Sequence, residues 1–228
     1  DFNRPLFSIC NPCLTYTVNP YQTACGIVDI MMHTMERYFS NDDDMEVTNV
    51  VAEAILKIVM EHAPIVLAEP ENYHSRAQIM WAGSLAHNDL TGCGNGGDWA
   101  THNIEHELSG MFDVSHGAGL AAIWPSWARY TRHQNINRFA RFAVNVMGVT
   151  NHFKSAEETA EAGIRAMEKF YTSIGMPINI KQLVGRNVTD AEIEEMADKC
   201  TNGNTMTVGG LIKLTKEDII NIYKLANE

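Results

Sequence analysis

The sequence predicts an all-α protein, a bundle of several helices. Most of the chain after Pro20 repeats its apolar residues at the three-to-four-residue spacing of amphipathic helices. Strand-like sequence is confined to residues 1–16, where Pro5 and Pro12 oppose a helix. We therefore expect 1–16 to be an extended linker or strand segment, and 17–228 to form one helical domain.

The expected helices follow one another with short connections. Two prolines fall inside them, and we expect Pro64 to end or kink one helix and Pro125 to interrupt another. In chain order the expected helices are 26–39, 47–68, 72–90, 98–110, 116–131, 136–148, 155–175, 189–201 and 215–227.

Side chains that cap helix amino termini mark three of these starts. Asp98 is a natural N-cap for the expected helix 98–110, which contains His102 and His106. Thr189 with Glu192 fits a capping box, and Thr215 with Asp218 is a looser match to the same pattern. These signals support the order of helices that the apolar spacing predicts.

Composition limits the class of partner. The net charge of −11 argues against a nucleic-acid partner, which requires clustered Lys and Arg. No apolar run reaches the roughly 18 residues of a membrane span, and we expect no signal peptide in the residues given. Five cysteines without regular spacing suit a reducing compartment, so we expect a cytoplasmic protein without a membrane partner.

Two helical segments carry a candidate set of metal ligands. Asp29 and His33 are four residues apart and share one helix face. His102 begins a second cluster, with His116 fourteen residues later at an expected helix start. Each pair is common by chance, but together they supply one carboxylate and three imidazoles. This donor set suits zinc, iron or nickel and leaves a coordination position open.

A competing interpretation uses His102, Glu105 and His106, which spell H-x-x-E-H. In zinc peptidases of this pattern the two histidines bind the metal and the glutamate is the general base. That site needs a further acidic ligand, for which Glu157, Glu158 and Glu161 are candidates. A third interpretation is a non-catalytic helical domain with incidental histidines.

The remaining residues of interest carry weaker signals. Trp99 lies three residues before His102 and is a candidate wall of the substrate pocket. Surface positions are the default for histidines outside the two clusters. This expectation covers His62, His74, His87, His133 and His152.

Three stretches of the chain, 11–39, 96–130 and 137–149, strongly resemble the iron-containing alcohol dehydrogenase family, in particular its butanol dehydrogenase-like branch. The resemblance extends over essentially the whole chain. It implies the helical, metal-binding carboxy-terminal domain found in dehydroquinate synthase-like proteins. It also implies hydride transfer between a primary alcohol or aldehyde and NAD(P), at an Fe²⁺ site in which Zn²⁺ or another divalent metal can substitute.

The resemblance assigns roles to individual residues. It implies that the metal ligands are Asp29, His33, His102 and His116. His106 matches a family histidine between the metal and the nicotinamide and is a candidate proton relay, while Thr15 matches a position where the backbone passes the cofactor. Family members also have an amino-terminal dinucleotide-binding domain, to which nothing in the 228 residues corresponds. We therefore expect this chain to be inactive alone, and the full-length enzyme to be a homodimer.

Overall fold

The computed structural model describes residues 5–151 and 155–228, and within these ranges the protein is helical, which confirms the predicted fold class. An isolated antiparallel bridge between Val208 and Leu214 is the nearest approach to a strand in the described residues. The helices are α1 (Pro20–Tyr38), α2 (Glu46–Ala68), α3 (Tyr73–His87), α4 (Ala100–Phe112), α5 (His116–Thr131), α6 (Ile136–Asn145), α7 (Ala156–Ser173), α8 (Ile180–Val184), α9 (Asp190–Cys200) and α10 (Lys216–Ala226), with 3-10 turns at Pro12–Thr15, Leu90–Gly92 and Arg132–Asn135.

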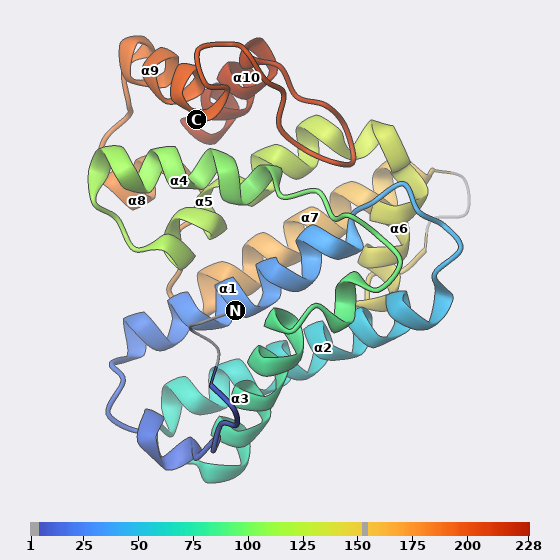
Figure 1. The fold of residues 1–228 in the computed structure, drawn as a ribbon, viewed down its shortest axis with the longest axis vertical. Coiled ribbons are helices and arrows are strands. Elements are labelled where there is room, and N and C mark those ends of the chain that lie inside the picture. The colour runs from blue at the N-terminus through green and yellow to red at the C-terminus, as the bar shows by residue number, and fades with distance from the viewer. Residues whose placement is uncertain (1–4, 152–154) are drawn as a thin grey trace.

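Helix α5 is the centre of the bundle. It packs against α1 and α4 on one side and against α7, α8 and α10 on others, and its Trp124 and Trp127 are almost fully buried. Figure 1 shows α4 and α5 between the α9–α10 pair and the long diagonal of α1, with α2 and α3 beyond α1. This arrangement brings the start of α5 and the first turn of α4 against the middle of α1.

Both prolines expected to interrupt helices lie inside continuous ones. Pro64 is within the last two turns of α2, and Pro125 is in the middle of α5. A proline inside a helix costs about 3 kcal/mol because it removes a hydrogen bond and crowds the preceding turn. Pro125 is buried among the core side chains of α5, so the packing of this helix outweighs the local penalty.

Capping follows the sequence closely, with one difference. The Thr189–Glu192 and Thr215–Asp218 capping boxes are both present. Asp98, however, lies one residue before the N-cap of α4, which is Trp99 in the left-handed conformation (φ 65°). The Asp98 carboxylate instead accepts hydrogen bonds from the backbone of Ala100, Gly210 and Leu211, and so joins the start of α4 to the loop before α10.

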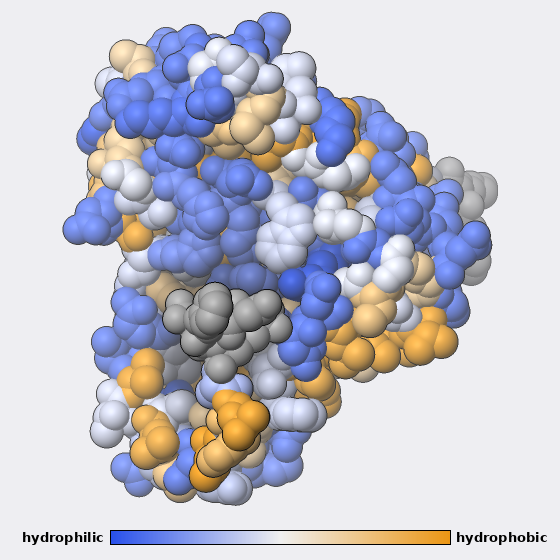
Figure 2. All heavy atoms as spheres, in the orientation of Figure 1, coloured by the Kyte–Doolittle hydropathy of each residue, from blue (hydrophilic) through white to orange (hydrophobic). Residues whose placement is uncertain are grey.

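The amino-terminal segment also differs from the expectation of an extended chain. Residues 5–11 are without regular structure, but Pro12–Thr15 form a 3-10 helix that packs against α3. Leu6, Phe7, Ile9 and Leu14 are largely exposed. Figure 2 shows apolar side chains over the region of α3 and this segment, whereas hydrophilic side chains dominate the region of α4. Among the described residues, no helix is sufficiently long and apolar to span a membrane.

Candidate metal centre

Helix α1 supplies the centre of the site. Asp29 and His33 are one turn apart on the face of α1 that meets α4 and α5, and their side chains are 28% and 22% exposed. The helix begins at Pro20 behind the N-cap Asn19, whose side chain accepts a hydrogen bond from the Gln22 amide. Because the helix is continuous from Pro20 to Tyr38, the spacing of four residues is translated directly into two side chains on one face.

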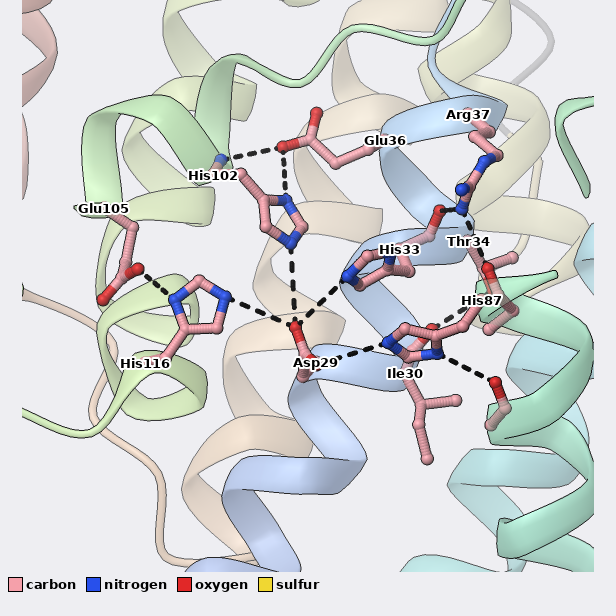
Figure 3. Close-up of polar contacts among 12 residues, drawn as sticks. Asp29, Ile30, His33, Thr34, Glu36, Arg37, His87, His102, Glu105 and His116 are labelled. Atoms are coloured by element: carbon pink, nitrogen blue, oxygen red, sulfur yellow. Dashed lines mark hydrogen bonds and ion pairs between the residues drawn. The ribbon is translucent and has the colours of Figure 1, made fainter. Parts of the chain in front are cut away.

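Three imidazoles converge on one oxygen of Asp29. The Nε2 atoms of His33, His102 and His116 lie 3.7, 3.6 and 3.4 Å from Asp29 Oδ1. Figure 3 shows the three rings directed at this oxygen from α1, α4 and α5. The distances are too long for hydrogen bonds, and within the described residues Asp29 Oδ1 and His102 Nε2 are buried without a hydrogen-bond partner.

Two glycines allow α5 to come this close. A methyl group on Gly117 would lie 2.6 Å from the carbonyl carbon of Cys25 and 2.7 Å from its Cα, both in the backbone of α1. A methyl on Gly119 would lie 2.8 Å from Cγ of Glu105 in α4. The small residues after His116 therefore set the distance between the imidazole of His116 and Asp29.

Two buried carboxylates hold the outer nitrogens of these histidines. Glu36 Oε1 accepts a hydrogen bond from the His102 amide at 2.9 Å and lies 3.0 Å from His102 Nδ1, and Glu105 Oε2 contacts His116 Nδ1. Glu36 and Glu105 are 2% and 0% exposed. Each carboxylate favours the tautomer with the proton on Nδ1, which leaves Nε2 free to bind a metal. Sequence reasoning passed over Glu36, although it lies seven residues after Asp29 on the same face of α1.

The residues of the site shift one another's pKa values strongly. Burial alone would raise the pKa of Asp29, but His102, His116 and His87 outweigh it and hold the pKa well below its usual range. Asp29 and Glu105 together raise the pKa of His116 to about 9. Burial, together with the nearby His87, lowers the pKa of His33 to about 4. The Asp29 carboxylate is therefore ionised, and His33 presents a neutral nitrogen.

The other predicted site residues lie at different distances from this centre. Trp99 borders it, with ring centroids 5.5 Å from His33 and 5.4 Å from His102. The exposed His106 is beside His116 at 5.3 Å between ring centroids, and burial lowers its pKa. Thr15 lies apart, where its hydroxyl donates to the Pro12 carbonyl and lines an apolar cavity of about 260 Å³ between α1 and α3.

His87, expected on the surface, is part of the cluster. Its Nε2 lies 3.4 Å from Asp29 Oδ2, and its ring centroid is 3.9 Å from that of His33. His87 is nevertheless exposed, with 40% of its side chain accessible. His62 is buried, with Nδ1 3.0 Å from Ser75 Oγ, whereas His74 and His133 are exposed as expected. His152 lies outside the described residues.

The geometry does not favour the peptidase interpretation. The rings of His102 and His106 are neighbours, with centroids 6.1 Å apart. Glu105, however, is fully buried against His116 and cannot reach a water bound between these two histidines. Of the three candidates for the further acidic ligand, Glu161 on α7 is engaged elsewhere, in ion pairs with Arg129 and Arg132.

The sequence of this chain is similar to a family model and to several known proteins. A model of the Fe-containing alcohol dehydrogenase family, C-terminal, matches residues 23–227. NADH-dependent butanol dehydrogenase A of Clostridium acetobutylicum is 35% identical over 226 residues, which are 98% of this chain and 57% of that protein. Probable NADH-dependent butanol dehydrogenase 1 of Bacillus subtilis is 38% identical over 221 residues, or 96% of this chain and 56% of the relative.

Solved structures give the same result. The aldehyde reductase YqhD from E. coli superposes with a TM-score of 0.91 at 32% identity, covering 98% of this chain and 57% of that one. NADH-dependent butanol dehydrogenase A from Thermotoga maritima superposes with a TM-score of 0.87 at 30% identity, covering 95% and 55%. The chain therefore spans somewhat more than half the length of the relatives it matches.

Proposed function

This chain belongs to the Fe-containing alcohol dehydrogenase family, and from that premise we propose that it supplies the metal site of an alcohol or aldehyde oxidoreductase that uses NAD(P). The proposed ligands of one divalent ion are Asp29, His33, His102 and His116. The whole protein would interconvert a primary alcohol and its aldehyde, as the names of the butanol dehydrogenase relatives suggest. A homodimeric assembly remains a prediction.

One observation carries the metal proposal: three Nε2 atoms surround a buried, unpartnered carboxylate oxygen at 3.4–3.7 Å. Donors bound at about 2.0–2.2 Å to a tetrahedral ion are separated by about 3.3–3.6 Å. The distances from Asp29 Oδ1 to the three nitrogens are thus close to those of a coordination shell. Hydrogen bonds would have drawn the same atoms to about 2.7–3.2 Å.

The donor set also limits which metal fits. Three imidazoles and one carboxylate suit Fe²⁺, Zn²⁺ and Ni²⁺ better than Mg²⁺ or Ca²⁺, which prefer all-oxygen shells. The family favours Fe²⁺. Zinc binds most nitrogen sites more tightly than ferrous iron does, so Zn²⁺ is the expected substitute in a purified sample.

The bound ion would act as a Lewis acid towards the substrate oxygen. Around it, this chain's own side chains would position the reactants. Trp99 would form one wall beside His33 and His102, at the distances given above. His106, exposed and next to His116, would pass a proton between the substrate oxygen and solvent, a role that suits an imidazole near neutral pH. Thr15 would lie along the cofactor, away from the metal.

Elemental analysis tests the metal proposal. The purified chain should contain about one divalent ion, and His102→Ala should lose it. His74→Ala is the matched control, because His74 is an exposed histidine on α3 and should leave the metal content unchanged. Metal-free wild-type protein that cannot be loaded with Fe²⁺ or Zn²⁺ would refute the proposal.

A further inference from the structure

Arg76 is a buried cation whose hydrogen bonds go to neutral oxygens. It lies near the start of α3 and is 5% exposed. Its Nε donates to the Pro70 carbonyl at 2.8 Å, and its Nη1 donates to Thr23 Oγ1 at 3.3 Å. A guanidinium has five N–H donors, so these two contacts leave part of its hydrogen-bonding capacity unused.

The other buried arginines of the described residues each pair with a carboxylate. Arg37 Nε lies 2.9 Å from Asp89 Oδ1, and Arg138 Nη2 lies 3.4 Å from Asp43 Oδ1. Arg76 forms no ion pair within residues 5–151 and 155–228, and burial lowers the pKa of its guanidinium. A buried charge without a counter-charge is unfavourable, so this position attracts an anion.

This cation lies in the wall of the apolar cavity between α1 and α3, which has a volume of about 260 Å³. The aliphatic part of the wall includes Ile27 and Ile30 from α1 and Ile79 and Met80 from α3. Among the described residues that line the cavity, Arg76 alone carries a charge. Figure 1 shows α3 and the amino-terminal segment beside the first half of α1. The cavity therefore combines an apolar surface with one cationic group.

Gly26 leaves room in this cavity. A methyl group added there would have no atom within 4 Å, whereas one on Gly83 would lie 3.1 Å from Ile30 Cδ1. Along α1, the wall extends from Thr23, which contacts Arg76, to Ile30. These seven residues span about 10 Å at about 1.5 Å per residue.

We propose that this cavity binds a short aliphatic carboxylate, with the carboxylate at Arg76 and the alkyl chain between α1 and α3. The carboxylate supplies the negative charge that Arg76 lacks and accepts hydrogen bonds from the N–H groups that Pro70 and Thr23 leave unused. A saturated chain of about six to eight carbons matches the wall, because each bond of about 1.5 Å advances an extended chain by about 1.25 Å. The site uses none of the proposed metal ligands and is independent of the proposed function.

Methyl NMR of the metal-free chain tests this proposal with hexanoate as the probe. With ¹³C-labelled isoleucine and methionine methyl groups, hexanoate should shift Ile30, Ile79 and Met80 saturably, with a Kd in the millimolar range or tighter. The alcohol of equal carbon number, 1-hexanol, should bind at least about tenfold more weakly, because hydrogen bonds to charged groups contribute more than neutral ones.

Two variants separate the cation from the apolar wall. Arg76→Gln should weaken hexanoate binding at least about tenfold and leave 1-hexanol binding unchanged. Arg165→Gln is the matched control, because Arg165 is 65% exposed on α7 and should have no effect. Gly26→Leu should abolish binding of hexanoate while the chain remains folded, because the leucine side chain enters open space and occupies the cavity.

Three results would each overturn the proposal. They are equal affinity of the wild-type chain for hexanoate and 1-hexanol, the absence of saturable shifts at these three methyl groups, and hexanoate binding that Gly26→Leu leaves intact. The first two are measured on the wild-type chain and decide the question even if a variant is poorly folded. None of them bears on the metal proposal, since the proposed metal ligands do not line this cavity.

Discussion

Gly117→Ala tests whether the contact between α5 and α1 sets the metal geometry. The added methyl would lie 2.6–2.7 Å from backbone carbons of Cys25. Carbon atoms in contact are ordinarily about 3.5–4.0 Å apart, so the first turn of α5 must retreat by about 1 Å. Backbone on both sides of the contact cannot move aside as a flexible side chain would.

A shift of about 1 Å in the first turn of α5 is large compared with the range over which metal–ligand distances vary. His116 precedes Gly117 and moves with it, whereas metal–ligand distances vary by only about 0.2 Å. We expect the variant to bind Zn²⁺ at least about tenfold more weakly, and overpacking to lower the free energy of unfolding by about 1–3 kcal/mol.

The assays are Zn²⁺ titration by calorimetry and thermal unfolding of the metal-free chain. Gly110→Ala is the matched control, because Gly110 is a glycine inside α4 with no atom within 4 Å of an added methyl. Alanine there should stabilise the helix by about 0.5–1 kcal/mol and leave Zn²⁺ affinity unchanged. Wild-type affinity in Gly117→Ala would refute the account of how His116 is positioned.

Three further predictions follow from the same contacts. Glu105→Gln should weaken Zn²⁺ binding about 10- to 100-fold, measured by competition with a chelator, while Glu107→Gln on the same helix should not. Zn²⁺ affinity should rise about tenfold per pH unit from pH 6 and level off near pH 9. Below its pKa of about 9, His116 holds a proton that the metal must displace. An affinity that does not change with pH would contradict this. Glu53→Gln should lower stability by about 1–3 kcal/mol in urea unfolding, because the buried Glu53 accepts hydrogen bonds from Tyr38 and Arg141.

The sequence predicted most of the fold because helical periodicity and capping are local properties. The α9 and α10 boundaries follow from Thr189 and Thr215, whose capping boxes involve only residues three apart. The expectation that Pro125 interrupts its helix was wrong for the opposite reason. Whether Pro125 ends a helix depends on the surrounding core, which local sequence does not describe.

The residues of the site likewise fall into those that local sequence predicts and those that depend on helix packing. Asp29 and His33 were recognisable as a pair because one helix turn joins them, and His102 and His116 because they are close in sequence. His87 belongs to the cluster only through the packing of α3 against α1, and Glu36 only through its hydrogen bond from the His102 amide in α4. A lone histidine at the end of a helix and a lone glutamate within one have no sequence pattern that distinguishes them from surface residues.

The buried carboxylates give a physical reason why the site needs a cation. Asp29, Glu36 and Glu105 lie within one group of packed helices, and two of them are almost completely buried. Unpaired carboxylates in such surroundings are costly, and protons on the histidines balance them only in part, because His33 has a pKa of about 4. A divalent ion at Asp29 Oδ1 would offset the negative charge of these carboxylates at every pH at which the histidine nitrogens that bind it are not protonated. We therefore expect the charges that make the metal-free site unfavourable to raise its affinity for a divalent ion, and metal binding to stabilise the contact of α1 with α4 and α5.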